Sequence, residues 1–328
     1  AHDLPLPADG GAMDFGIHIG TRGCLTSREN VMAVAQCAEA LGYAYLGVSD
    51  HLIVPVRSEV RYPYTADGRW PGADTGDCFD CIATLAFLAG CTQRIKLLTS
   101  VVVVPYRPAV LTAKLFTTAD VLSGGRVIAG IGVGWMPEEF AALGAPPFAE
   151  RGAVTDEYLE TWRLLWTDAR PAYDGKYAKF ADVLFSPKPA SQPGLPIWVG
   201  GESAPALRRT VKYGDAWYPA SNNQTIHLST PARLQKGVEQ LHRVAERAGR
   251  DPSSIDVAYL WFAPPMWNTE RSPEPWQLFS GSSDDMLADA AALETAGARH
   301  AIFYVQRPTI EETLDVIQRF GEEVVRKA

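Results

Sequence analysis

The most constraining feature of this sequence is a unit that recurs along the chain. An amphipathic stretch ends at a glycine, and a short apolar segment follows within a few residues, as at Gly42, Gly214 and Gly297. A helix that closes on a glycine and returns through a short turn to a buried strand is typical of α/β folds. Taken along the whole chain, the apolar periodicities predict eight strands and eight helices in strict alternation.

The alternation predicts the architecture. Eight units in one chain without a linker favour closure into a (β/α)8 TIM barrel, and an open doubly wound sheet is the alternative. We expect a leader at residues 1–13 and one domain at residues 14–328. Insertions are expected in the strand-two loop (52–76) and the strand-five loop (168–195), and the arginines and aromatic residues of the first favour a lid. The strands are predicted at residues 14–20, 45–48, 95–104, 127–129, 197–199, 216–218, 257–262 and 301–305.

Composition excludes several classes of function. The net charge of −8 argues against a general affinity for nucleic acid or for an anionic membrane. No apolar run reaches the roughly 18 residues that a membrane span needs. Five cysteines in 328 residues do not form a disulfide framework, which is consistent with a reducing cytoplasm. Cys78 and Cys81 lie in an apolar, helix-like pattern without a second pair at zinc-ligand spacing, so we expect no metal site.

The segment 126–144 carries the strongest functional signal. A buried strand loses its side chains at Gly130, Gly132 and Gly134 and leads into an acidic helix start. Glycines at a strand end let a flat ligand approach the backbone. The spacing matches neither G-x-G-x-x-G nor a Walker loop, so a flat ring is favoured over a phosphate wrapped by a helix. The alternative is that the glycines only allow the strand to bend into a helix.

In a barrel of this kind, the residues that follow each strand meet at one face. Asp50 and His51 close strand two; His51 can exchange a proton near neutral pH, and Asp50 is available to orient its ring or to bond a cofactor. Gly200 and Gly201 precede a helix start, where free backbone amides suit a phosphate, although a plain turn explains them equally well. The other residues predicted at this face include His18, Ser100, Val133, Trp135, Ser203 and Trp261.

Four segments resemble the luciferase-like family of (β/α)8 oxidoreductases, and most closely its coenzyme F420-dependent branch: GIGVGWMPEEFAALG, SDHLIVP, TSVVVVPYRPAVLTAKLFTTADVLSGGRV and PIWVGGES. The resemblance covers the chain from Asp14 onward, and it is less specific for F420 over FMN than for the family. It implies a non-proline cis peptide at Ser100-Val101 behind a deazaflavin ring, and a homodimer. By the resemblance, the cofactor-binding residues are Asp50, Ser100, Val101, Gly132, Val133, Gly134, Gly200, Gly201 and Ser203, and His51 is catalytic.

One departure narrows the function. The F420-dependent sugar-phosphate dehydrogenases have a carboxylate directly after the last strand-four glycine, where this chain has Trp135 followed by Met136. We therefore expect hydride transfer between F420 and a small, largely apolar substrate, held near His18, Trp135 and Trp261. The alternatives are an FMNH2-dependent monooxygenase that uses oxygen and a separate flavin reductase, and a family member that binds a flavin without turnover.

Overall fold

The computed structural model describes residues 13–70, 72, 75–268 and 277–328 and confirms the predicted closed barrel. All neighbouring barrel strands are parallel, and the last strand pairs with the first through contacts such as His18 with Tyr304. The barrel strands are β1 (Asp14–Ile19), β2 (Tyr45–Val48), β3 (Lys96–Thr99) continued by β4 (Val102–Val103), β5 (Val127–Gly132), β8 (Ile197–Gly200), β9 (Ala216–Tyr218), β10 (Asp256–Trp261) and β11 (His300–Tyr304).

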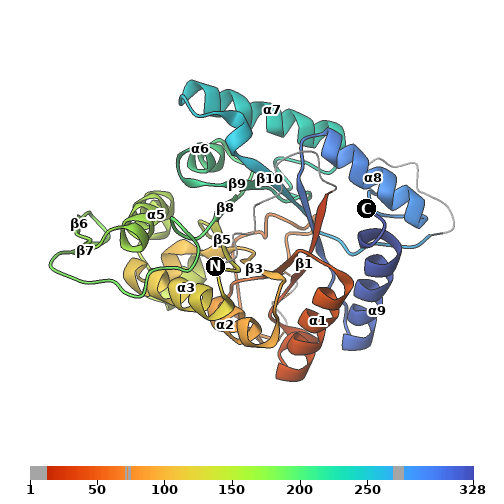
Figure 1. Cartoon of the computed structure of the whole chain (residues 1–328), viewed down its shortest axis with the longest axis horizontal. Coiled ribbons are helices and arrows are strands. Elements are labelled where there is room, and N and C mark those ends of the chain that lie inside the picture. Colours follow the sequence, from red (N-terminus) through yellow and green to blue (C-terminus); the bar gives the residue numbers. More distant parts are fainter. Residues whose placement is uncertain (1–12, 71, 73–74, 269–276) are drawn as a thin grey trace.

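Helices surround these strands, as Figure 1 shows. Two helix termini are formed as the sequence predicts. Gly42 follows the first helix in the left-handed conformation at φ 90°, and Thr309 and Glu312 form a capping box at the start of the last helix. A short helix follows β5 at the predicted acidic helix start. The helices are α1 (Arg28–Leu41), α2 (Cys81–Cys91), α3 (Ala109–Ser123), α4 (Pro137–Ala142), α5 (Arg151–Thr167), α6 (Ala204–Tyr213), α7 (Pro231–Arg247), α8 (Ser283–Thr295) and α9 (Ile310–Phe320).

Apolar side chains bury both faces of the barrel strands. One cluster fills the barrel interior, and a larger one packs between the strands and the helices. On β10, for example, Leu260 belongs to the inner cluster and its neighbour Trp261 to the outer one. This arrangement is expected for parallel strands, because helices cover the outside while side chains fill the inside.

Three predicted boundaries are corrected. The strand predicted at 95–104 is interrupted by a cis peptide between Ser100 and Val101, which is the bond that the family resemblance implies. Helix α2 begins at Cys81, because the Asp80 side chain accepts a hydrogen bond from Ala83 N and caps it, so Cys78 lies before the helix. Met13, assigned to the leader, is buried in the core; the rest of the predicted leader lies outside the described residues.

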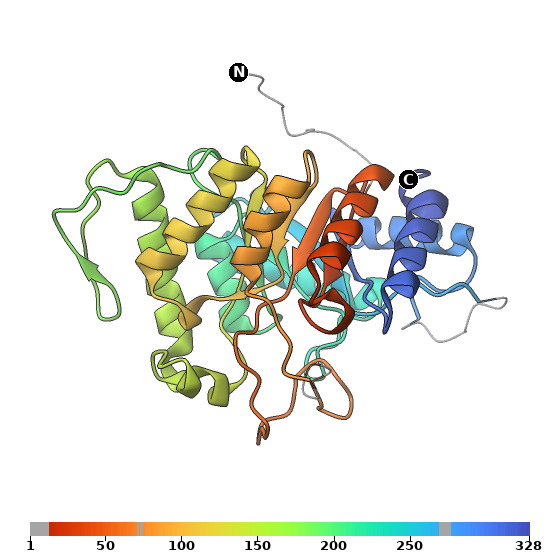
Figure 2. The same cartoon turned by 90° about the horizontal axis from the view of Figure 1, so that it is seen from below.

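The two predicted insertions lie at opposite ends of the barrel. In Figure 2 the 52–76 loop extends below the strands, at the end where the strands finish. The 168–196 segment precedes β8 and carries a hairpin of β6 (Tyr173–Asp174) and β7 (Lys179–Phe180), which Figure 2 shows at the far left. Within the described residues, no helix is long and apolar enough to cross a membrane.

Candidate active site

A cavity of about 220 Å³ opens at the C-terminal ends of the strands, where TIM-barrel active sites lie. It collects side chains from most of the strands and from the 52–76 loop. The lining residues are His18, Arg22, Ser49, Asp50, His51, Tyr62, Pro63, Tyr64, Trp70, Ser100, Val101, Val103, Gly132, Val133, Gly134, Trp135, Gly200, Gly201, Glu202, Tyr218, Ala220, Leu260, Phe262 and Tyr304.

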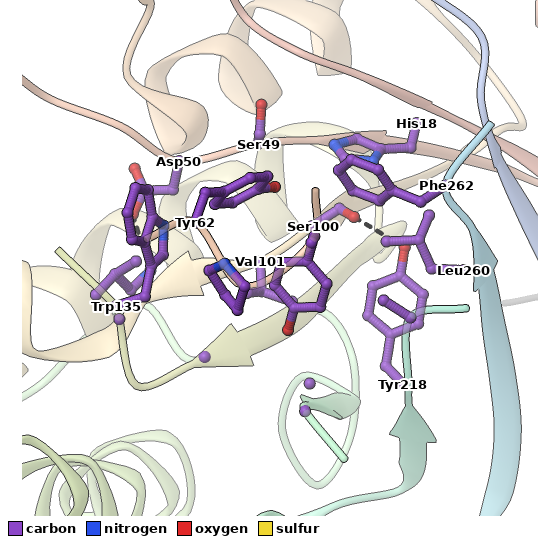
Figure 3. Close-up of a pocket in the computed structure, with 18 of the residues that line it drawn as sticks. His18, Ser49, Asp50, Tyr62, Ser100, Val101, Trp135, Tyr218, Leu260 and Phe262 are labelled. Atoms are coloured by element: carbon purple, nitrogen blue, oxygen red, sulfur yellow. Dashed lines mark hydrogen bonds between the residues drawn. The ribbon is translucent and has the colours of Figure 1, made fainter. Parts of the chain in front are cut away.

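Glycines and the cis peptide form one wall of this pocket. A Cβ on Gly132 would lie 2.6 Å from Val101 Cγ2, and one on Gly200 would lie 3.1 Å from the same valine's Cγ1. Larger residues at these two positions would therefore displace Val101. Ser100 Oγ and Tyr218 OH share a hydrogen bond of 2.8 Å, drawn in Figure 3, which fixes the start of the wall. The result is a wall in which the Val101 side chain lies against Gly132 and Gly200, and a flat ring can approach this wall.

His51 is oriented by a buried glutamate. His51 Nδ1 lies 2.9 Å from Glu139 Oε2, whose side chain is fully buried, while the imidazole is 12% exposed. Glu139 also accepts hydrogen bonds from Leu52 N at 2.7 Å and from Tyr106 OH at 2.7 Å. Burial raises the pKa of Glu139, but the bonds from His51, Leu52 and Tyr106 offset this and hold the pKa below its usual value.

Glu139 is therefore ionised at neutral pH and can only accept hydrogen bonds. His51 must donate through Nδ1, and Nε2 is the ring atom left to exchange a proton. Sequence reasoning noted the acidic helix start at 137–140 but gave Glu139 no role. The sequence feature that could have indicated Glu139 is that two carboxylates, Glu138 and Glu139, follow the glycine-rich strand end.

Asp50 is held by an arginine. Its carboxylate accepts two hydrogen bonds from the Arg107 guanidinium, at 2.8 and 2.9 Å, and a third from Val103 N at 2.9 Å. It makes no hydrogen bond to His51, so the interpretation that it orients this ring is wrong. Asp50 instead ties the end of β2 to Arg107 through a buried ion pair and to β4 through Val103 N. It lines the pocket, and its role in cofactor binding stays a prediction.

His18 stands out electrostatically. It is 3% exposed and lines the pocket, and neither ring nitrogen has a hydrogen-bond partner among the described residues. Burial, helped by the positive charge of Arg22, lowers the pKa of His18 to about 3. The imidazole is therefore neutral at physiological pH. Figure 3 shows it beside Phe262, on the far side of the pocket from Asp50 and Trp135.

Glu202 is a pocket carboxylate that the sequence did not single out. It follows Gly201 and is 5% exposed. Its oxygens accept hydrogen bonds from Ala220 N at 2.7 Å and Asn223 Nδ2 at 2.6 Å. Burial, only partly offset by these bonds, raises the pKa of Glu202 to about 7. A carboxyl group that titrates near neutrality within a pocket is a common feature of functional sites.

Two predicted site residues lie outside the pocket. Trp261 points to the outer side of β10 and packs against the Phe279 ring at 6.1 Å, while Leu260 and Phe262 line the cavity. One residue along a strand reverses the side-chain direction, which explains the difference. Ser203 is the N-cap of α6, where its hydroxyl accepts a hydrogen bond from Ala206 N, next to Gly200 and Gly201 but not on the wall.

Aromatic rings from the 52–76 loop cover the site. The Trp70 ring centroid lies 4.1 Å from that of His51, and Tyr62 lies 5.0 Å from Trp135. Tyr62, Trp70 and Met136 form a small buried cluster of their own. The loop thus closes over His51, as a lid that limits water access does. Residues of the 168–196 insertion do not line the cavity.

Comparison with known proteins places this site in a family context. A model of the luciferase-like monooxygenase family matches residues 13–300. An uncharacterised protein of Mycobacterium tuberculosis (strain ATCC 25618 / H37Rv) is 32% identical over 219 residues, which cover 67% of this chain and 74% of that one. The FMNH2-dependent dimethylsulfone monooxygenase of Pseudomonas putida is 27% identical over 194 residues, or 58% of this chain and 48% of the other.

Solved structures show the same architecture. An F420-dependent secondary alcohol dehydrogenase, in complex with an F420-acetone adduct, superposes with a TM-score of 0.72 over 96% of this chain and 99% of the other. Its sequence identity of 18% supports a shared fold only. The family model spans most of the chain, including every pocket strand except the last. This chain therefore belongs to the luciferase-like monooxygenase family.

Proposed function

We propose that this protein is an oxidoreductase that transfers a hydride between coenzyme F420 and a small organic substrate. The observation that carries the proposal is the pairing of His51 with ionised Glu139 at the pocket wall. Reducing a carbonyl adds a hydride to carbon and a proton to oxygen, and oxidising an alcohol removes both. A site for this chemistry needs a proton-exchanging group beside the hydride carrier, and His51 Nε2 meets that need.

The pocket residues fit a flat tricyclic ring. The wall formed by Val101 against Gly132 would hold one ring face, and the backbone of Gly200 and Gly201 would meet the phosphate. F420, when bound, supplies a carbon that accepts or gives a hydride. The protein positions that ring, excludes water with Tyr62 and Trp70, and exchanges the proton through His51.

The arginines of the 52–76 loop do not place positive charge on the cavity wall. Arg61 donates to Ala66 O within that loop, and Arg57 does not line the cavity. The family's structural neighbours include F420-dependent enzymes, which supports the cofactor choice.

The second candidate is an FMNH2-dependent monooxygenase that works with a separate flavin reductase. A curated relative is an FMNH2-dependent enzyme, and the glycine wall accommodates either ring system.

A homodimer also remains our expectation. Its support is a stripe of exposed apolar side chains on α3, consisting of Val110, Leu111, Leu115, Val121 and Leu122.

Cofactor titration tests the proposal. Trp70 and Trp135 line the pocket, so tryptophan quenching reports binding directly. We expect micromolar affinity for F420 and much weaker affinity for FMN. The reduced protein–cofactor complex should also be stable in air, because reduced F420 reacts only slowly with oxygen. Tighter FMN binding, with rapid oxidation in air, would replace the proposal with the monooxygenase.

A further inference from the structure

Two pocket residues have hydrogen-bonding groups that the described residues leave unused. Both ring nitrogens of His18 are unpaired within the described part of the chain, although burial deprives them of bulk water. A buried donor or acceptor without a partner destabilises a fold, so such a group on a cavity wall indicates a ligand that completes it. His18 is neutral, so it offers one N–H donor and one acceptor to the cavity.

Arg22 is the second residue. Its side chain is partly exposed and lies over the Trp70 and Tyr304 rings, at 5.8 and 5.9 Å. Its guanidinium carries five N–H donors, and it makes one side-chain hydrogen bond, from Nη2 to Tyr304 OH at 3.0 Å. Among the described residues, no carboxylate lies within ion-pair distance of it. A Cβ on Gly20 would lie 2.2 Å from Arg22 Nη1, so the glycine makes room for the guanidinium against the backbone.

The two groups lie on the same wall of the pocket. His18 and Tyr304 are paired across β1 and β11, and their rings meet edge to face at 5.6 Å. Tyr304 also carries the hydroxyl that binds Arg22. Tyr304 therefore joins the neutral imidazole and the cation into one unit. The proximity of Arg22 is one reason for the lowered pKa of His18.

The other charges of the pocket are already compensated or bonded. Asp50 is paired with Arg107, and His51 with Glu139. Glu202 is bonded to Ala220 N and Asn223. Arg22 is thus the lining cation without a counter-charge in the described chain, and this imbalance favours an anionic ligand.

A row of aromatic rings extends from this polar corner. Tyr64, Phe262 and Tyr304 form a stacked row, with ring centroids 6.0 and 5.4 Å apart. Phe262 also touches His18 edge to face at 6.0 Å. A ligand that fits here has a flat apolar body along these rings and an anionic group at Arg22.

We propose that Arg22 and His18 form a carboxylate subsite, so that the substrate is an organic acid with a flat apolar body. Arg22 donates to one or both carboxylate oxygens, and the His18 N–H donates to the same group. The identification of this ligand as the substrate rests on the proposed function. The acidic tail of F420 is a second source of the same chemistry.

Binding of a matched pair of probes tests the subsite without turnover. The probes are 4-oxo-4-phenylbutanoate and its primary amide, which share the aromatic ketone and differ in charge. We expect isothermal titration calorimetry on the full chain to give at least about 10-fold tighter binding of the acid, the scale of a hydrogen bond to a charged group. Arg22→Gln should abolish the preference, and Arg22→Lys should restore part of it.

Two further variants separate the subsite from general damage. His18→Phe keeps the ring shape and loses both nitrogens, so acid binding should weaken several-fold while the amide is little affected. Arg233→Gln, at an exposed position of α7, should leave both affinities unchanged. Equal binding of acid and amide by the wild type, or an unchanged preference in Arg22→Gln, would overturn the subsite.

A third comparison identifies the source of the carboxylate. We expect Arg22→Gln to leave the affinities for F420 and for its tail-less deazaflavin riboside equally unaffected. Selective weakening of F420 would assign Arg22 to the cofactor tail and overturn the substrate assignment. The preference for the acid over the amide is measured without cofactor, so its outcome is independent of whether F420 binds. Failure of F420 to bind, with the preference intact, would reject the proposed function alone.

Discussion

His51 Nδ1 lies 2.9 Å from Glu139 Oε2, although the two residues are 88 positions apart, His51 in the loop after β2 and Glu139 in the helix α4 after β5. The contact joins the segment after the glycine-rich strand end to the histidine that follows the second strand. Glu139 also accepts hydrogen bonds from Leu52 N and Ile53 N, so it fixes the start of the 52–76 loop as well as the imidazole. One buried carboxylate thus couples His51 to the segment that covers it.

The first prediction concerns this carboxylate as a positioning residue. Glu139→Gln keeps the side-chain shape but removes the charge that stabilises a protonated His51. We expect kcat to fall about 10²-fold with little change in KM, within the ~10²–10⁴-fold that a positioned acid–base group contributes. Steady-state kinetics over a range of pH measures the effect.

Tyr106→Phe is the matched control for Glu139→Gln. It removes a hydrogen bond to the same carboxylate oxygen and leaves the contact with His51 in place. Its kcat should stay within a few-fold of the wild type. If both variants lose activity equally, Glu139 acts by holding the local structure, and its proposed role towards His51 is wrong.

The glycine wall gives a second prediction. In Gly132→Ala the new Cβ would lie 2.6 Å from Val101 Cγ2 and would displace Val101 from the wall on which we propose that the ring lies. Overpacking of this kind destabilises a fold by about 1–3 kcal/mol, and we expect cofactor affinity to fall at least about 10-fold. Fluorescence titration and thermal unfolding measure the two effects.

Gly90→Ala is the control, because a Cβ at this position of α2 meets nothing within 4 Å. It should leave cofactor affinity unchanged and raise the free energy of unfolding by up to about 1 kcal/mol, the helix propensity difference. Unaltered cofactor binding in Gly132→Ala would show that the ring does not lie on this wall.

The buried ion pair of Asp50 and Arg107 gives a third prediction. Arg107→Met leaves the Asp50 carboxylate buried without its cation, which destabilises a protein by about 3–5 kcal/mol. Urea unfolding measures this change. The double variant Asp50→Asn/Arg107→Met should recover part of the loss, because the fully buried carboxylate is then neutral, while Asp80, the other partner of Arg107, is 32% exposed and partly hydrated.

An exposed ion pair provides the comparison for Arg107. Lys179 and Asp174 are 74% and 78% exposed, so Lys179→Met should change the free energy of unfolding by less than about 1 kcal/mol. If Arg107→Met were equally mild, the pair would be well hydrated, and the destabilisation that we assign to its burial would not exist.

The sequence was sufficient for the order of elements and for the face that carries the site. Local periodicity and terminal glycines such as Gly42 depend on short-range physics, which a single sequence records well. The partners of site residues depend on tertiary structure. The sequence placed Asp50 beside His51 in the chain, but the fold gives Asp50 to Arg107 and gives His51 to Glu139.

The misplacement of Trp261 has a related cause. A strand that is exposed on one side alternates between apolar and polar residues, and this alternation reveals which residues point inward. Leu260, Trp261 and Phe262 are all apolar, because both faces of β10 are covered. The pattern therefore predicted the strand, but it did not show which of its residues point into the barrel. The residues that point inward are the two neighbours of Trp261.

The last prediction concerns a histidine at the opposite end of the barrel. His300 Nδ1 lies 3.2 Å from Asp14 Oδ2, and Nε2 lies 3.7 Å from Asp256 Oδ2, with Tyr45 OH 3.1 Å from Nδ1. Burial lowers the pKa of His300, but the two carboxylates more than offset this, and the net shift is upward. The pKa values of Asp14 and Asp256 are lowered in turn.

These shifts fix the pH window in which the cluster stabilises the fold. Because the pKa of His300 is higher in the folded than in the unfolded protein, the charged histidine contributes its full stability below the unfolded-state pKa near 6.5. This stability is lost as the pH rises through the folded-state pKa. Lowered aspartate pKa values stabilise it above about 3.9, and that effect is lost as pH falls. The contribution is therefore greatest between about pH 4 and 6.5. Asp14, Asp256, Tyr45, Lys96 and Arg299 are the ionisable groups nearest to the imidazole.

His300→Gln tests this window. The difference in Tm between wild type and variant should be largest near pH 5.5 and should shrink towards pH 9, where His300 of the wild type loses its charge and keeps only its neutral hydrogen bonds. His227→Gln, at an exposed position, should shift Tm little at any pH. Thermal unfolding at a series of pH values measures both variants. A difference for His300→Gln that stays constant from pH 5.5 to 9 would mean that the histidine stabilises this end of the barrel by packing against Trp198, whose ring stacks on it at 5.2 Å, and not by its charge.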